Sequence, residues 1–209
     1  ILSGLVGSEM CIRDSFQTPA SVSVITREQL EQRGDANLVD AITRSAGISG
    51  MGHPGNSGSS LSTRGFTDTT SVMRLYDGTR QYGGVGVSFP FDTWSIDRVE
   101  VLRGPASVIY GDGAIGAVVN VIPKKPTRGA IQNEVQATIG TDNTQRLGLG
   151  SGGAINDKLS YRIDLSGDRS DGWVDMGNSR NLTFSGALQL DVSCLLYTSP
   201  SPRDQRGSR

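Results

Sequence analysis

The stretch from Ile96 to Ile122 most constrains the fold, because its pattern changes three times within one short segment. It opens with apolar and polar residues in alternation, breaks at Gly104-Pro105, crosses Gly111, Gly113 and Gly116, and resumes as a β-branched run. Alternation indicates a strand, and clustered glycines indicate tight turns or close backbone approach. The stretch therefore predicts a strand, a helical turn, a glycine loop and a second strand.

The preceding N-terminal part predicts a strand followed directly by a short helix. Ala20–Ile25 alternates small polar and β-branched residues. Thr26 and Gln29 have the spacing of a capping box, in which each side chain satisfies the other residue's backbone N–H. We expect a helix over Arg27–Arg33 that stops at Gly34, where a positive φ carries no Cβ penalty.

A second short helix is expected next. Either Asn37 or Asp35 can cap its start, and Gly47 is the predicted end. Its predicted apolar face consists of Leu38, Ala41 and Ile42.

Two strands and two loops are predicted between this helix and Ile96. Leu61–Arg64 and Val72–Tyr76 have strand character, and Asp77-Gly78 after the second is a strong turn signal. Residues 50–60 and 79–88 are rich in glycine and small polar residues, so we expect exposed loops there.

The C-terminal half alternates apolar and polar residues over four segments. They cover 131–139, 144–153, 159–166 and 182–190, and a polar loop is expected over 167–180. Alternation alone fits both a half-buried meander in a soluble protein and transmembrane β-barrel strands. Soluble strands average about five or six residues, so segments of about ten residues favour the barrel interpretation.

Composition excludes several classes of function. The net charge is −1 at pH 7, which argues against the clustered basic face that a nucleic-acid partner requires. We find no apolar run near the roughly 18 residues of a membrane helix. Cys11 and Cys194 are the two cysteines of the sequence, and both lie near its ends.

Catalytic and metal sites are not expected. The Gly111 to Gly116 segment reads G-x-G-x-x-G, but a β-branched run ending at Pro123 follows, so it offers no helix N-terminus for a pyrophosphate. His53 is the sole histidine, which excludes a site with several histidine ligands. Asp97, Arg98, Glu100 and Arg103 are better explained as an internal ion-pair network, because strand alternation places Arg98 and Glu100 on one face.

The two ends of the sequence are related to each other. Cys194–Asp204 and Leu5–Asp14 can be encoded by complementary strands of one DNA segment, which resembles a transposition adapter used to prepare sequencing libraries. We therefore expect residues 5–15 and 194–209 to derive from the adapter, which leaves residues 1–4 of unknown origin. This expectation leaves 16–126 as a first domain and 127–193 as a second.

The central stretch resembles the signature of the plug domain of TonB-dependent outer-membrane receptors, close to (I/V)ERVEVLRGPASxLYGxGAxGGVVN. The resemblance extends to the Ser21–Thr26 opening, the Arg64-Gly65-Phe66 triplet and the Pro123–Pro126 exit. It implies an α+β plug, a small mixed sheet with short helices, followed by the first four antiparallel strands of a truncated transmembrane β-barrel. The structural motif residues implied are Arg64, Gly65, Asp77, Gly78, Arg98, Glu100, Arg103, Gly104, Gly111, Gly113 and Gly116.

The siderophore-receptor branch of this family is the nearest in motif. It implies capture and import of a ferric siderophore across the outer membrane of a Gram-negative bacterium, with lipid around the strands and no cofactor beyond the iron of the chelate. The TonB complex would act through a box expected upstream of Phe16, together with a signal peptide. The ligand residues implied, all in loops facing outward, are His53, Asn56, Asp68, Thr69, Arg80, Gln81 and Tyr82.

Two alternatives stay open at this point. A receptor of the same family for cobalamin, haem or an oligosaccharide would share the plug and differ in its outward loops. A soluble β-rich binding module would keep the alternation without a membrane.

Overall fold

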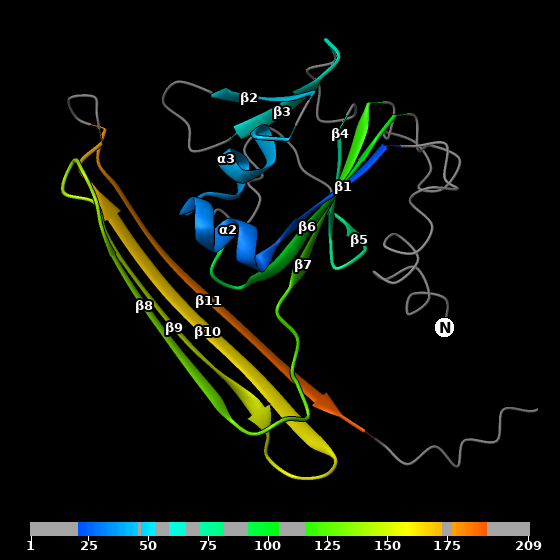
Figure 1. Cartoon of the computed structure of the whole chain (residues 1–209), viewed down its shortest axis with the longest axis vertical. Helices are drawn as coiled ribbons and strands as arrows, with labels where there is room; N and C mark the ends of the chain where they lie inside the picture. The colour runs from blue at the N-terminus through cyan, green and yellow to red at the C-terminus, as the bar shows by residue number, and fades with distance from the viewer. Residues whose placement is uncertain are drawn as a thin grey trace, which may run out of the picture.

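The protein folds into an N-terminal domain built on a five-stranded sheet and a long C-terminal sheet of four strands (Figure 1). The computed structural model describes residues 21–45, 47–52, 59–65, 72–81, 92–104, 116–172 and 177–191. A single chain segment after β7 leads from the first sheet to the second (Figure 1). Mixed sheet, short helices and antiparallel strands confirm the predicted α+β fold class.

The five-stranded sheet has the order β1-β6-β7-β4-β5. Parallel pairing occurs between β4 and β7, and the other neighbours are antiparallel. The central strand β7 is buried at every position from Ala117 to Ile122, which explains its continuous β-branched run. The strand bounds are β1 (Ser21–Thr26), β4 (Val72–Tyr76), β5 (Thr79–Arg80), β6 (Ile96–Arg103) and β7 (Ala117–Pro123).

Both predicted helices form, and the first matches its prediction residue for residue. In α2 (Arg27–Arg33) the capping box of Thr26 and Gln29 is present, and Gly34 is left-handed with φ 66°. The second helix, α3 (Leu38–Thr43), is capped by Asn37, whose side chain accepts the Val39 N–H at 2.9 Å. Within the described parts of the chain, no helix has the length and apolarity needed to cross a membrane.

The predicted end of α3 at Gly47 is wrong. The helix ends at Thr43, and a bond from Ser45 N to Ile42 O tightens its last turn. Gly47 has φ 81° and turns the chain toward the next strand. The glycine therefore shapes the connection rather than the helix end.

The loop predicted over 50–60 is also wrong where the structure describes it. Strands β2 (Ile48–Gly52) and β3 (Ser59–Thr63) pair as a two-stranded sheet beside α3. A Cβ on Gly50 would lie 3.0 Å from Thr43 Cγ2 and 3.5 Å from Val39 Cγ1. Gly50 thus permits close packing of the hairpin on α3, a role that a glycine-rich sequence does not distinguish from a loop.

The loop predicted over 79–88 begins later than expected, because Thr79 and Arg80 form β5. Asp77 and Gly78 both have positive φ, 48° and 77°, as a tight hairpin turn of this kind requires. The turn returns the chain along β4, where Gln81 N donates to Arg74 O at 2.9 Å.

The main core of the N-terminal domain lies between its five-stranded sheet, the two helices and the hairpin. The apolar faces of α2 and α3 pack on it as their periodicity predicts. Its buried members are Ile25, Leu30, Leu38, Val39, Ala41, Ile42, Ile48, Leu61, Val72, Ile96, Val99, Val101, Ala117, Val119 and Val121.

The C-terminal sheet is an antiparallel meander in sequence order, β8-β9-β10-β11. Its strands are β8 (Gln132–Ile139), β9 (Gln145–Ala154), β10 (Leu159–Ser170) and β11 (Ser179–Leu190). The loop predicted over 167–180 is shorter than expected, because pairing continues as far as Ser170 with Ser179.

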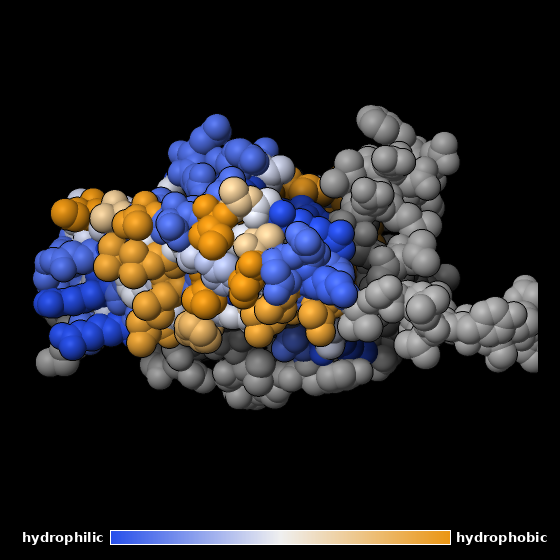
Figure 2. All heavy atoms as spheres, turned by 90° about the horizontal axis from the view of Figure 1, so that it is seen from below, coloured by the Kyte–Doolittle hydropathy of each residue, from blue (hydrophilic) through white to orange (hydrophobic). Residues whose placement is uncertain are grey.

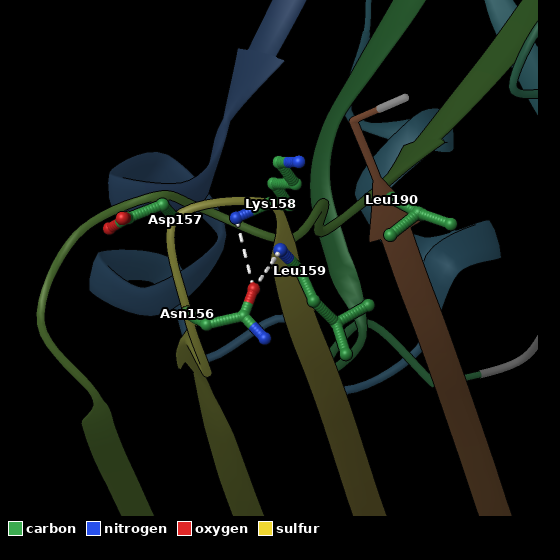
Figure 3. Close-up of a pocket in the computed structure, with 5 residues that line it drawn as sticks. All are labelled: Asn156, Asp157, Lys158, Leu159 and Leu190. Atoms are coloured by element: carbon green, nitrogen blue, oxygen red, sulfur yellow. Dashed lines mark hydrogen bonds between the residues drawn. The ribbon is translucent and has the colours of Figure 1, made fainter. Parts of the chain in front are cut away.

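The turn between β9 and β10 is closed by Asn156 (Figure 3). Its Oδ1 accepts the backbone N–H groups of Lys158 and Leu159 at 3.0 and 2.8 Å. A shallow hollow beside this turn is also lined by Asp157 and Leu190. The turn's polar side chain is engaged with its own backbone, so we assign no ligand to this hollow.

In the C-terminal sheet the polarity of the two faces is the reverse of that in a soluble protein. Apolar side chains are exposed, and polar side chains are buried. The sheet's outward side chains are apolar yet exposed, with Val135, Leu182 and Ile139 at 72%, 80% and 87%. Figure 2 shows apolar side chains gathered in a broad patch on the molecule seen from below. The inward side chains of β10 are polar and buried, namely Ser160, Arg162, Asp164 and Ser166. A half-buried soluble meander buries its apolar face instead, so this arrangement fits a sheet whose outer face meets lipid.

Candidate functional site

The inward polar face of the C-terminal sheet contacts the N-terminal domain around residues 92–95, just before β6. A bridge from Asp92 to Asn37 ties this segment to the start of α3. Thr93 Oγ1 donates to Asp35 O at 2.6 Å. The segment is therefore fixed within its own domain before it meets the second sheet.

Trp94 is the largest side chain at this contact and is 4% exposed. Its Nε1–H donates to Leu149 O on β9 at 3.0 Å. A Cβ on Gly148 would lie 2.7 Å from the indole ring, so only glycine leaves room for the ring here. We call this place on β9 the glycine slot.

Two cations lie against the indole ring. The guanidinium carbon of Arg27 is 5.1 Å from a ring centroid of Trp94, and Lys124 Nζ is 4.3 Å from one. Arg27 also donates to the carbonyls of Thr93, Trp94 and Ile96 at 2.9 to 3.1 Å. Burial lowers the pKa of Lys124, although a hydrogen bond to Glu134 opposes that shift. Cation–π contacts strengthen in such desolvated surroundings.

A first ion pair crosses the contact beside Trp94. Asp92 pairs with Arg146 of β9 and accepts from the hydroxyl of Ser166 on β10. The same carboxylate accepts the Trp94 backbone N–H at 2.8 Å. The Asp92 and Arg146 side chains are only 3% and 11% exposed, so each depends on the other for its charge to be buried.

A second cluster of charges connects Lys124 to β8 and β10. Arg162 binds Asp164 through its Nη2 at 2.6 Å and Glu134 through its Nη1 at 3.0 Å. Lys124 adds contacts of 2.8 Å to Glu134 and 3.5 Å to Asp164. Two cations thus balance two anions, which is the condition for burying charge without a large penalty.

Glycines on β9 also make room for this cluster. A Cβ on Gly150 would lie 2.9 Å from Arg162 Nη2, and one on Gly152 would lie 2.8 Å from Arg162 Cδ. Because alternate residues of a strand share a face, Gly148, Gly150 and Gly152 form one inward row. That row is the floor on which Trp94 and Arg162 lie.

The end of β4 also lies near β11. Tyr76 is close to Ser185 there, and burial raises the tyrosine pKa. Taken together, these contacts bind one domain to the other through satisfied polar groups. In the described ranges, no three His, Cys, Asp or Glu side chains are grouped to hold a metal ion.

The predicted pairing of Arg98 with Glu100 is confirmed. Arg98 Nε donates to Glu100 Oε1 at 3.0 Å, and Arg98 Nη1 donates to Asp97 Oδ2 at 2.8 Å. Asn120 of β7 donates to the other Glu100 oxygen at 3.2 Å. Arg103 reaches across to β1 and donates to the Ser23 hydroxyl.

Several predicted motif residues occupy left-handed backbone positions. Gly65, Gly78 and Gly104 have φ of 85°, 77° and 110°, and Arg64 and Asp77 have φ of 50° and 48°. Gly104 N donates to the carbonyl of Gly116 at 3.0 Å, so the chain leaves β6 and enters β7 at one place. Gly111 and Gly113 lie outside the described residues.

The predicted ligand residues are only partly visible. Arg80 lies half-buried on β5, and Gln81, which follows it, is exposed. Five of the seven fall outside the described residues, namely His53, Asn56, Asp68, Thr69 and Tyr82. The structure therefore leaves the predicted ligand site as a prediction.

The sequence reasoning missed the contact between the domains. The local pattern singles out neither Trp94, Lys124 nor Arg146, and it presents the glycines of β9 only as part of an alternating segment. A signal was present, because Arg146 and three glycines share one face of this strand, and a strand rarely carries three glycines on one face without a close neighbour.

Comparison with known proteins identifies the family. Residues 14–118, half of the chain, match the model of the TonB-dependent Receptor Plug Domain. The chain is 30% identical over 164 residues to the ferrioxamine B receptor of Salmonella typhimurium strain LT2, covering 77% of this chain and 23% of that protein. It is 29% identical over 187 residues to a vitamin B12 transporter of Vibrio vulnificus, covering 83% of this chain and 30% of that protein.

A solved structure shows the same arrangement. The ferripyoverdine receptor of the outer membrane of Pseudomonas aeruginosa superposes with a TM-score of 0.75 at 26% identity, over 85% of this chain and 24% of that receptor. The chain thus spans about a quarter of the length of the relatives it matches. The matched plug model and the shared fold establish that this chain belongs to the TonB-dependent receptor plug domain family.

Proposed function

We propose that the chain is the plug and first barrel strands of an outer-membrane receptor that binds a ferric siderophore and imports it with energy from the TonB complex. The observation that carries this proposal is the C-terminal sheet, whose exposed outer face is apolar and whose inner polar face holds the N-terminal domain. A barrel wall that surrounds a folded plug needs this polarity.

The separate roles of the two domains follow from that geometry. A wide barrel leaves an aqueous channel unless something fills it. The N-terminal domain fits that role, because polar groups satisfied across the contact let it lie against a polar wall. Transport then requires the plug to shift, and in this family the TonB complex supplies the work through a segment upstream of the plug.

The relatives support a ferric siderophore as ligand. One is a ferrioxamine B receptor, and the solved structure is a receptor bound to ferripyoverdine. Arg80, Gln81 and Tyr82 would offer a cation, an amide and an aromatic face to an anionic chelate. The vitamin B12 transporter among the relatives favours cobalamin as the second candidate, on a plug of the same design.

Uptake measurements on the full-length receptor test the proposal. We expect cells that carry it to accumulate radioactive iron from a ferric hydroxamate, and to stop doing so when TonB is deleted. Cobalamin uptake is measured in the same strains, so that cobalamin import without iron import would transfer the assignment to the second candidate. Iron uptake that persists without TonB would contradict the energised mechanism.

The predicted ligand role of Arg80 has its own test. Arg80→Gln is expected to weaken chelate binding to the purified receptor, while Arg33→Gln, an equal loss of charge at an exposed position on α2, is expected to leave binding unchanged. Equal affinities for both variants would remove Arg80 from the site and leave the family assignment intact.

A further inference from the structure

Three parts of the molecule converge on Trp94. Arg27 of α2 donates to the Trp94 carbonyl at 2.9 Å. Lys124, in the segment that leads out of β7, places its ammonium over the ring and donates its backbone N–H to Ser95 O at 2.9 Å. On the other side, β9 supplies the glycine slot and accepts the indole N–H.

Trp94 is set apart from the apolar core of its own domain. Although it is buried, it belongs to neither hydrophobic cluster of the described residues. Its neighbours are instead a glycine backbone on the second sheet, two cations and a carbonyl oxygen. Replacing Trp94 therefore removes the indole ring from the contact between the domains without opening a cavity in either hydrophobic cluster.

The cations that flank the ring belong to different elements. Arg27 is the first residue of α2 and is bound to three carbonyls around Trp94. Lys124 is bound to Glu134 of β8. Arg27 thus joins the ring to α2 of its own domain, and Lys124 joins it to β8 of the second sheet.

We propose that Trp94 is the positioning residue that seats the plug against the barrel wall. This inference rests on the proposed function, because a seat matters only in a receptor whose plug closes a pore. Within that receptor, the glycine slot fixes where the plug sits, and the two ion-pair clusters beside it are aligned only when the ring is in the slot.

The slot can be tested by filling it. Gly148→Ala in the full-length receptor puts a methyl group 2.7 Å from the indole ring, so the ring has to leave. Gly186→Ala is the matched control, because it makes the same change on β11, where the new atom meets nothing closer than 3.4 Å. Trp94→Leu removes the ring itself, and the double variant Gly148→Ala with Trp94→Leu restores space.

Leakage is measured as entry of a glycopeptide antibiotic into cells that lack TonB, with the amount of receptor in the outer membrane determined for each variant. We expect Gly148→Ala and Trp94→Leu each to leak several-fold more than wild type and Gly186→Ala. The double variant is expected to leak less than Gly148→Ala alone, because a smaller side chain fits the filled slot. A role in stability alone predicts instead that the amount of receptor in the outer membrane falls while leakage per receptor stays unchanged.

If neither single variant leaks more than wild type, the proposed positioning role of Trp94 is wrong. It is also wrong if the double variant leaks as much as the two single variants combined. Should Gly148→Ala fail to reach the outer membrane, the comparison of Trp94→Leu with Gly186→Ala decides alone. Chelate uptake by wild type is followed in parallel with TonB present. If the wild-type receptor imports no chelate but Gly148→Ala and Trp94→Leu still leak, the positioning role of Trp94 stands and the proposed function is wrong.

Discussion

Removal of the Asp92 charge gives the sharpest test of how the two domains are held together. Asp92→Asn keeps the size of the side chain and an oxygen that can accept the Trp94 N–H, which lies 2.8 Å from the carboxylate. It deletes the partner of Arg146, whose side chain is 11% exposed. The cost therefore falls on a buried guanidinium left without its counter-charge.

The expected magnitude follows from that burial. Breaking a buried ion pair by removing one partner costs about 3 to 5 kcal/mol. We expect the lower end, because Thr93 Oγ1 lies 3.3 Å from Arg146 Nη2 and remains available to it. About 3 kcal/mol corresponds to a roughly 100-fold change in an equilibrium constant.

Native-state hydrogen exchange of the full-length receptor in detergent measures this equilibrium. In the peptide that spans residues 92–104, the Trp94 amide is expected to exchange roughly 100-fold faster in Asp92→Asn than in wild type, because exchange reports local opening. Asp97→Asn is the matched control, since the Asp97 side chain is 48% exposed in its pair with Arg98. An exposed pair contributes about 0 to 1 kcal/mol, so the control should exchange less than about sixfold faster.

A double variant separates the ion pair from other causes. Asp92→Asn with Arg146→Met removes both charges, and replacing both partners of a buried pair is often neutral. We therefore expect it to recover most of the protection lost in Asp92→Asn. Equal exchange in Asp92→Asn and Asp97→Asn, or a double variant no better than the single, would refute the reasoning.

Three further predictions concern the N-terminal domain. Thr26→Ala should destabilise α2 by about 1 kcal/mol through loss of the capping box, and amide exchange in the helix should become faster. Thr127→Ala, at an exposed threonine, is the control, and equal exchange in both variants would contradict the role of the cap. Gly78→Ala should lower the free energy of unfolding by about 1 to 2 kcal/mol in melting experiments, because φ is 77° at this position. Gly129→Ala, with open space around it, should change the free energy of unfolding little, and equal melting of the two variants would count against strain at the turn. The pKa of Tyr76 should lie above its usual value of 10.0, so its stabilising contribution is present below pH 10.0 and is lost as the pH rises through the raised pKa. Tyrosinate absorbance, compared between wild type and Tyr76→Phe, tests this, and ionisation of Tyr76 at or below pH 10.0 would refute it.

Local signals in the sequence predicted the elements of the N-terminal domain well. The capping box of Thr26 and Gln29 and the Asp77-Gly78 turn each involve neighbouring residues, so their chemistry is readable without the fold. The predicted ion pair of Arg98 with Glu100 was correct for the same reason, because strand alternation fixes which face each side chain takes. What the family resemblance added was the order of these elements and the identity of the second sheet.

The contact between the domains could not be predicted in this way. Strand alternation shows that Arg146 and Arg162 share the polar face, but not that Asp92 and Trp94, more than fifty residues earlier, lie against it. The predicted ligand loops fail for a different reason. Their residue types suit a chelate, yet most of them fall outside the described residues, so their geometry stays a prediction.

Glycine content led to a wrong loop prediction at the β2–β3 hairpin and hid a contact on the correctly predicted strand β9, and the reason is physical. Glycine is compatible with a flexible loop, but it is also the only residue that allows another group to approach the backbone within Cβ distance. Gly50 lets a hairpin pack on α3, and Gly148 lets an indole ring lie on β9. A glycine in a loop and a glycine at a close contact differ in which atoms an added methyl group would meet. That difference depends on the neighbouring residues and not on the glycine itself. In a plug enclosed by a polar wall, glycine on an inward strand face is therefore evidence of contact, and the side chain that fills the space is the residue to look for.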